Sequence, residues 1–359
     1  MIPADEIGEI LEALDLSRAQ PGIGFLEALF TRFNARVPFE NATKILRDRE
    51  ITDVSDKPRT PEIFWADHLA SGSGGTCFAR VAAFDALLSA LGFRTRRLLG
   101  RVEHDGDHAG LAVETGAGET LADVGFPLPA LLPADAERVE SARSELAIAR
   151  TARGIAVEWV DGVPEGPRAL ELFSETVSEE RFAEHWRRTF HPGSKFLKRI
   201  AMRRDLENRS VSYAGGFLRV DDRHSRLRIA LGPAQEPAAQ RLSEIFGIDS
   251  EILARAFALV GEDPTPETES TLTAYLEVAA SPEEAYARIA PAEGYRALVE
   301  KVAEVVSQEP TATGYRLTLA SPGAPREAQQ GAAAVDEVSP EPSALTIRLE
   351  RRMILFWPK

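Results

Sequence analysis

The chain has little of what stabilises or anchors secreted and membrane proteins. Its 359 residues include one cysteine, so an internal disulfide is impossible and a reducing cytoplasm is the expected compartment. The same shortage excludes zinc sites built from several cysteines, and we expect no metal. The sequence has no run of about 18 apolar residues, and its acidic start, Met1–Ile10, lacks the basic and apolar regions of a signal peptide. From these absences we expect no membrane-spanning helix and no secretory signal peptide.

Positive charge is also scarce. The chain has 42 Lys and Arg against 56 Asp and Glu, a formal net charge of -14, which argues against a broad nucleic-acid-binding surface. Two local arginine clusters lie within residues 94–101 and 199–204. They are either solvated faces of strands and helices or contacts for an anionic cofactor.

Apolar periodicity divides the chain into helical and strand-rich parts. Residues 1–92 follow a helical pattern, and residues 93–220 a pattern of short strands interrupted by a helix at Glu179–Trp186. Within the strand-rich part, 155–160 and 211–220 are each expected to be one strand. Two more helices are expected at Pro237–Phe246 and Ser250–Val260. Residues 261–270 are polar, acidic and proline-containing, which is typical of a linker.

The lone Cys77 is placed where a thiol can be reactive. It follows residues 71–76, a glycine-rich segment expected to be a flexible loop, and it opens a helix expected over Cys77–Leu91. Without such context a cysteine is either a buried small hydrophobe or a reactive thiol. The unpaired amides and partial positive charge of a helix N-terminus stabilise a thiolate and can hold an oxyanion. This position favours a nucleophile.

His108 and Asp123 supply the groups that a cysteine nucleophile needs, a base and a carboxylate that orients it. They lie on two expected strands, which we take to form a hairpin. A loop at Gly116–Ala117 and a register shifted by two residues both place the two side chains on one face, because side chains alternate along a strand. The shifted register would put them directly opposite each other.

Other residues compete for these roles. His104 is a second candidate for the base, and Asp105 and Asp107 are further candidates for the carboxylate. An aspartate before Val-Gly-Phe, as Asp123 is, is also typical of a turn.

Taken together, these residues resemble the arylamine N-acetyltransferase family, over roughly residues 5–258. The similar segments are Pro38–Asn41, Gly74–Phe78, His108–Val113, Asp123–Phe126, His191–Phe196 and Arg241–Asp249.

The resemblance implies an α+β, papain-like fold of that family, with a helical domain over 1–92, a β-barrel over 93–220 and an α/β lid over 221–260. It implies that acetyl-coenzyme A or another acyl-coenzyme A is the acyl donor and that a small-molecule amine is the acceptor. It also implies a ping-pong route and no bound cofactor. The implied roles are nucleophile for Cys77, base for His108 and orienting carboxylate for Asp123. The residues implied to line the acyl and acceptor pocket, or else to pack as ordinary core, are Phe39, Val102, Phe126 and Phe196.

Two departures leave the substrate open. Ser73 stands where the family usually has an arginine that pairs with the glutamate equivalent to Glu40, and Arg80 is a candidate substitute. Ala79 stands where a glutamate is usual. An amide synthase of the macrolactam-closing kind therefore fits almost as well as an arylamine acetylator. The sequence is also compatible with a transglutaminase-like cysteine hydrolase and with a non-catalytic binding protein.

The tail, residues 271–359, is expected to be an α+β appendage. It weakly resembles the START-like lipid-binding and polyketide-cyclase fold, and an unspecified α+β appendage is the favoured alternative. The expected elements are strands at Thr271–Val278, Gly314–Leu319 and Ala344–Phe356 and helices at Pro282–Ile289 and 292–306.

Overall fold

The structure is a computed structural model of the chain. It describes residues 2–116, 118–126, 128–160, 169–206, 208–222, 225–230 and 238–261. It also describes five C-terminal strands: β14 (Thr271–Val278), β15 (Glu304–Thr311), β16 (Gly314–Ala320), β17 (Gly331–Ala334) and β18 (Leu345–Glu350).

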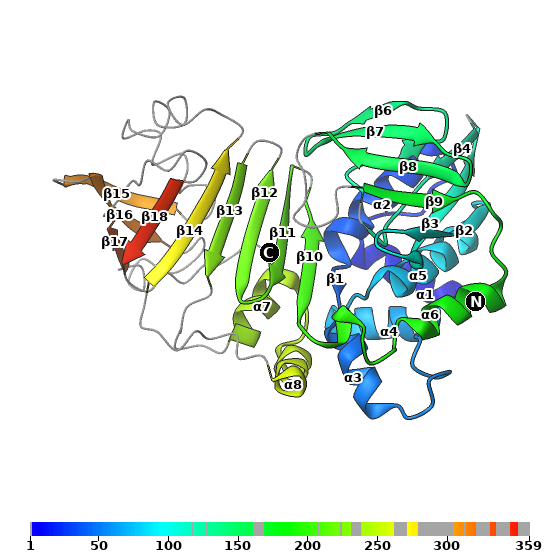
Figure 1. Ribbon diagram of the computed structural model, residues 1–359, viewed down its shortest axis with the longest axis horizontal. Coiled ribbons are helices and arrows are strands. Elements are labelled where there is room, and N and C mark those ends of the chain that lie inside the picture. The colour runs from blue at the N-terminus through cyan, green and yellow to red at the C-terminus, as the bar shows by residue number, and fades with distance from the viewer. Residues whose placement is uncertain are drawn as a thin grey trace.

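Helices make up most of the N-terminal part, as expected. They are α1 (Ala4–Ala13), α2 (Ile23–Arg36), α3 (Ala42–Glu50), α4 (Pro61–Ser71) and α5 (Cys77–Ala90). Helix α5 confirms the predicted helix to within one residue, and every residue from Cys77 to Asp85 is buried. A helix buried all round belongs to a core. It packs against α4 on one side and β2 and β3 on another, so Cys77 begins a central element (Figure 1).

An antiparallel eight-stranded sheet forms a nearly closed barrel beside these helices (Figure 1, right). Its strand order is β5-β4-β3-β2-β9-β8-β7-β6. The strands are β2 (Thr95–Arg101), β3 (Asp105–Thr115), β4 (Gly118–Leu121), β5 (Leu132–Pro133), β6 (Arg138–Glu140), β7 (Glu145–Arg150), β8 (Gly154–Trp159) and β9 (Ala169–Phe173). The predicted α+β class, with a helical part beside a β-barrel, is therefore confirmed.

A second sheet crosses the other half of the molecule (Figure 1, left), in the order β1-β10-β11-β12-β13-β14-β18. Its further strands are β1 (Phe39–Glu40), β10 (Ala201–Asp205), β11 (Arg209–Ala214), β12 (Phe217–Asp222) and β13 (Ser225–Ala230). The single strand predicted over 211–220 is wrong, because Gly215 and Gly216 have φ angles of 58° and 83°. Two consecutive left-handed residues make the tight turn of a hairpin.

The remaining described helices are α6 (Glu179–Arg188), the short 3₁₀ helix η1 (Lys195–Leu197), α7 (Ala238–Phe246) and α8 (Ser250–Val260). Helices α6, α7 and α8 confirm the helices expected in those places.

In the tail, β14 and β16 confirm two predicted strands, and β18 lies within the third. Strand β14 pairs with β13, while β15, β16 and β17 form a separate small sheet. The helix expected at 282–289 lies outside the described residues, as does the one expected at 292–306 up to residue 303. From Glu304 the chain is strand, so the end of the second helix was wrong. The linker, the domain boundaries and the START-like resemblance stay predictions.

Candidate active site

The segment before Cys77 is tightly held. The expectation of a flexible loop over 71–76 is wrong, because Ser71 ends α4 and Ser73–Thr76 are buried. Gly75 donates its amide to the Pro38 carbonyl at 3.3 Å, and the Glu40 amide donates to the Gly75 carbonyl at 3.1 Å. A Cβ atom on Gly74 would lie 1.7 Å from the Pro38 oxygen. Glycine is thus required for the close approach that fixes the position of Cys77.

Cys77 itself is nearly enclosed. The residue is 8% exposed, and its Sγ lies 3.9 Å from the carbonyl oxygen of Asp107. Cys77 is the first residue of α5, after the N-cap Thr76, so the free amides of the first helical turn lie next to the sulfur.

His108 and Asp123 are in contact. His108 Nε2 and Asp123 Oδ2 are 2.6 Å apart, and both side chains are buried. The other carboxylate oxygen of Asp123 accepts the amides of Gly125 at 2.8 Å and Phe126 at 3.0 Å. The two oxygens of Asp123 therefore make separate contacts, one with the amides of the turn and one with the imidazole.

The route to this contact differs from the one expected. Strand β4 pairs with β3 in the register that joins Thr115 to Gly118, so the shifted register is wrong. Strand β4 also ends at Leu121, and Asp123 lies in the turn that follows rather than in a strand. The carboxylate reaches the imidazole because the chain folds back after Leu121.

The turn can come this close because Gly125 has no side chain. A Cβ atom there would lie 2.5 Å from the Ala109 oxygen, 2.9 Å from Cys77 Cβ and 3.1 Å from His108 Cε1. Gly125 therefore lies against both the cysteine and the histidine, which brings the three side chains together.

Electrostatics favour a protonated imidazole. Burial disfavours the charged ring, but the charge of Asp123, its hydrogen bond and the contact with Cys77 outweigh burial and raise the pKa of His108 above its ordinary value. Since Nε2 is taken by Asp123, Nδ1 is the nitrogen left for the thiol.

The competing residues are exposed or have other partners. His104 is exposed. The Asp107 carboxylate accepts the backbone amides of residues 102–104, each at 2.9 Å, and Asp105 pairs with Arg153 at 2.8 Å.

The four expected pocket residues lie on segments that adjoin this group. The ring of Phe126 is 6.3 Å from that of His108, and Phe39 and Phe196 meet edge to face at 5.6 Å. Val102 is half-buried against the core. Sequence reasoning missed Trp159, whose ring lies 5.3 Å from Phe126.

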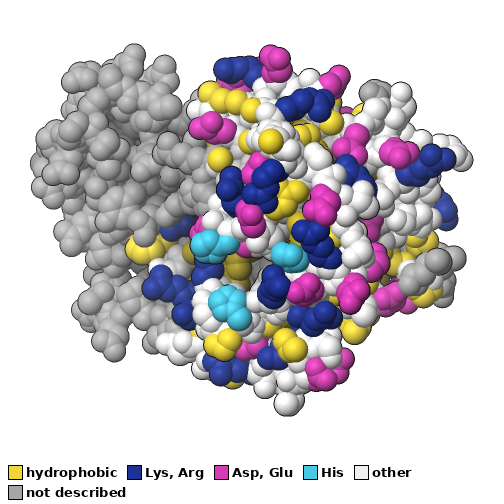
Figure 2. Space-filling view, turned by 45° about the vertical axis from the view of Figure 1, so that its right-hand side comes forward, with side chains coloured by type: hydrophobic (Ala, Val, Ile, Leu, Met, Phe, Trp, Pro, Cys, Tyr) yellow, Lys and Arg dark blue, Asp and Glu magenta, His cyan; other side chains and the backbone are white. Residues whose placement is uncertain are grey.

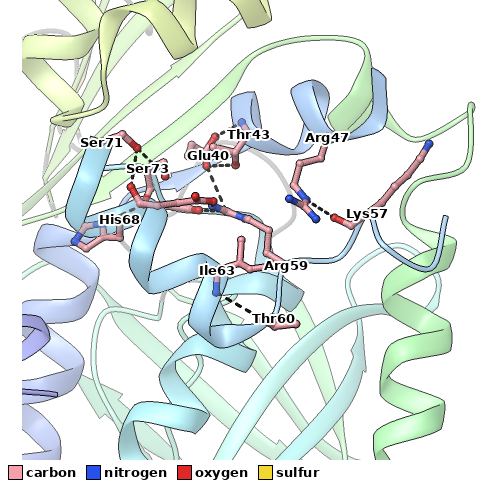
Figure 3. Close-up of polar contacts among 12 residues, drawn as sticks. Glu40, Thr43, Arg47, Lys57, Arg59, Thr60, Ile63, His68, Ser71 and Ser73 are labelled. Carbon is pink, nitrogen blue, oxygen red and sulfur yellow. Dashed lines mark hydrogen bonds and ion pairs between the residues drawn. The ribbon is translucent and has the colours of Figure 1, made fainter. Parts of the chain in front are cut away.

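Arg80, the candidate partner of Glu40, is not the arginine that pairs with it. Arg80 makes no ion pair with it; Arg59 does, with its Nη2 at 3.8 Å from Glu40 Oε1 (Figure 3). Glu40 also accepts the amide of Thr43 at 2.9 Å, and Arg59 donates to the Gly74 carbonyl. An arginine from another loop thus compensates for Ser73. Nothing in the sequence indicated this pairing, because Arg59 lies in none of the segments that resemble the family.

A buried lysine was also missed. Lys44 donates to the Thr189 hydroxyl at 2.6 Å and lies 4.6 Å from the centre of the Phe190 ring. Burial lowers the pKa of Lys44 to about 8, against the opposing charges of Cys77 and Asp48.

The arginines of 94–101 are engaged by carboxylates rather than free to hold an anion. Basic and acidic side chains are interspersed on the face drawn in Figure 2. The arginines of this cluster pair with carboxylates, as in Arg96–Glu119 at 2.7 Å and Arg101–Glu171 at 3.0 Å. The cluster is therefore largely neutralised.

In the described part of the chain, no set of three or more His, Cys, Asp or Glu side chains is arranged to hold a metal. No helix of that part has the length and apolarity to span a bilayer.

Known proteins similar to this chain identify its family and its fold. A family described as N-acetyltransferase matches residues 23–253. The curated arylamine N-acetyltransferase of Escherichia coli strain K12 is 34% identical over 115 residues, which span 30% of this chain and only 38% of that relative.

Two solved structures share the fold. The arylamine N-acetyltransferase of Mycobacterium smegmatis is 22% identical, with a TM-score of 0.61 covering 73% of this chain and 99% of that one. That of Mycobacterium marinum in complex with CoA is 19% identical, with a TM-score of 0.59 covering 71% and 98%.

Proposed function

Because this chain belongs to the arylamine N-acetyltransferase family, we propose that it moves an acyl group from acyl-coenzyme A to an arylamine-type amine through a thioacyl enzyme. Cys77 is the nucleophile, His108 the base and Asp123 the carboxylate that orients the base. The observation that carries the proposal is the sulfur at the start of α5, next to an imidazole held at 2.6 Å by a buried carboxylate.

The first half-reaction acylates the thiol. The proton of Cys77 passes to His108 Nδ1, and the thiolate attacks the carbonyl carbon of the donor thioester. Backbone amides at the start of α5 stabilise the tetrahedral oxyanion. Collapse of this intermediate breaks the bond to the coenzyme A sulfur, which leaves with a proton from His108.

The second half-reaction transfers the acyl group. The amine attacks the thioacyl carbonyl, His108 accepts a proton from the amine nitrogen, and Cys77 leaves. The aromatic side chains of Phe39, Phe126 and Phe196 form apolar surroundings that disfavour water and hence hydrolysis.

Intact-protein mass spectrometry tests the first step. Protein mixed with acetyl-coenzyme A is expected to gain one acetyl group, which neutral hydroxylamine removes because it is held as a thioester. The adduct should be absent in Cys77→Ala and much slower to form in His108→Gln. Absence of an adduct with every acyl-coenzyme A tried would contradict a coenzyme A donor.

A screen of amines tests the second step. Release of coenzyme A thiol that depends on an arylamine, with the amide as product, is the expected result. Release without any amine, with free acid as product, identifies a hydrolase instead. If amides form with aliphatic amines alone, the acceptor is an aliphatic amine and not an arylamine.

A further inference from the structure

Arg80 occupies an unusual place for a charged side chain. It lies one turn after Cys77 on α5, is 1% exposed, and stacks over Phe33 with its guanidinium carbon 4.9 Å from the ring centre. Keeping a charge in such a place costs free energy unless it is well paired.

The pairing of Arg80 uses neutral oxygens. Its Nε donates to the Val124 carbonyl at 2.7 Å, its Nη2 to Asn34 Oδ1 at 2.7 Å, and its Nη1 to the Val37 carbonyl. Among the described residues, no carboxylate lies within ion-pair distance of Arg80. Burial lowers the pKa of Arg80 to about 9, and the more distant charges of Asp205 and Asp123 oppose this.

These three bonds reach three different parts of the site. Val124 follows Asp123 in the turn that carries the carboxylate. Val37 leads into Pro38 and Phe39, which bracket the loop before Cys77. Asn34 lies on α2 (Figure 1). One planar guanidinium, carried by α5, thus bonds to the turn of Asp123, to the segment that leads to Phe39 and to α2. These elements bring Cys77, Asp123 and Phe39 together.

We propose that Arg80 is a positioning residue, which holds the Asp123 turn and the Phe39 strand against the start of α5 so that His108 meets Cys77 in a fixed geometry. The inference deepens the proposed function and rests on it for its catalytic consequence. Lysine cannot replace Arg80, because an ammonium is a point charge without the planar fork that serves three separate acceptors.

The test compares Arg80→Lys with Arg204→Lys. Arg204 is the matched control, since it also donates to backbone carbonyls, those of Ala35 and Ile245, but bonds no residue of the Asp123 turn. Urea unfolding first establishes that both variants are folded. The position of the Asp123 turn is then read from the NMR titration of the His108 ring, assigned with His108→Gln, and from the pH profile of Cys77 alkylation.

In Arg80→Lys the pKa of His108 is expected to fall toward its ordinary value, because the Asp123 carboxylate is no longer held against the ring. Alkylation at neutral pH should slow. With acyl donor and amine, kcat should fall about 100-fold while KM changes little, the effect of a misplaced reacting group. Arg204→Lys should match the wild-type protein in all three measurements.

Wild-type titration and alkylation in folded Arg80→Lys would overturn the proposal. If that variant does not fold, Asn34→Ala decides, because it removes one guanidinium contact and keeps the charge. It is expected to shift the His108 titration part of the way, and no shift would reject the role. If the wild-type protein forms no acyl adduct, the proposed function fails, yet the ring titration still decides the role of Arg80.

Discussion

At the scale of single residues, Asp123 joins two tasks in one carboxylate. One oxygen caps the turn of Gly125 and Phe126, and the other holds His108. The turn fixes the direction of the second oxygen, so local backbone structure pre-organises the histidine before any substrate binds.

The substitution Asp123→Asn separates these tasks. The amide oxygen can still cap the turn, but the side chain no longer has the charge that stabilises the protonated imidazole. We expect acylation of Cys77 to slow by about 1,000-fold, and alkylation at neutral pH to slow as well. Stopped-flow acylation with acetyl-coenzyme A measures this. Asp105→Asn, at an exposed competitor carboxylate, is the control and should react at the wild-type rate; equal losses in both variants would reject the assignment.

His68 gives a second prediction, for pH. It is buried under the loop before Cys77, where its Nδ1 lies 3.0 Å from the Ser73 oxygen (Figure 3). Burial, helped by the charges of Arg80 and Arg59, lowers the pKa of His68 from 6.5 to about 4. Between these values the unfolded chain binds more protons than the folded one, so stability is lost as pH falls through this window, by about 3 kcal/mol in all.

Urea unfolding between pH 4 and 7 checks this, with His68→Gln as the variant. The variant should lose less stability over this window than the wild-type protein does. His104→Gln, at an exposed histidine, should keep the wild-type pH dependence. Parallel curves for His68→Gln and the wild-type protein would show that His68 does not carry the effect.

At the scale of elements, the loop between α4 and α5 is fixed by a neighbouring strand. Gly75 and Phe39 form an isolated parallel bridge, and backbone bonds join Gly75 to Pro38 and Glu40. The buried Arg59–Glu40 pair (Figure 3) joins the same two segments, because Arg59 also donates to the Gly74 carbonyl. The position of Cys77 is therefore set by tertiary contacts on both sides of the loop.

The substitution Gly74→Ala tests how tightly the loop between α4 and α5 is held. The new Cβ would meet the Pro38 oxygen at 1.7 Å, and one of the two backbones has to shift. We expect the free energy of unfolding to fall by about 3 kcal/mol, with loss of thiol acylation in whatever remains folded. Gly116→Ala is the control, since nothing lies within 4 Å of its Cβ position, and it should change stability by less than about 0.5 kcal/mol. Normal acylation in Gly74→Ala would mean that the loop tolerates movement.

At the scale of the whole molecule, Asn41 joins the helical part to the second sheet. Its amide group donates to the carbonyls of Phe196 at 2.8 Å and Arg199 at 2.6 Å, and its oxygen accepts the Ala201 amide at 2.8 Å. The side chain is fully buried, and its partners are more than 150 positions away in the chain.

Asn41→Ala removes all three bonds and leaves buried backbone groups without partners. We expect a loss of about 3 kcal/mol in the free energy of unfolding, together with a raised KM for the acceptor, because η1 carries Phe196. Urea denaturation and steady-state kinetics measure the two effects. Gln240→Ala, on the exposed side of α7, should change neither. A loss of stability with an unchanged KM would place Phe196 outside the acceptor pocket.

The sequence by itself determined most of the elements and the identity of the candidate site residues. The helical periodicity from Cys77 onward and the glycines before it depend only on neighbouring residues. Such local patterns can be recognised in the sequence without any information on distant contacts. The same holds for α6, α7, α8 and the hairpin of β3 and β4. The motifs that resemble the family also named His108 and Asp123 before any geometry was known.

Only the tertiary structure decided how these parts meet. It placed Asp123 in a turn rather than opposite His108 on a strand, and it fixed the loop before Cys77 by backbone hydrogen bonds. It also paired Glu40 with Arg59, and it bonded Arg80 to the turn of Asp123. Each of these depends on which backbone carbonyls and charges become neighbours after burial. Such contacts join residues far apart in the sequence, and the energy of a buried charge is set by surroundings that no local pattern contains.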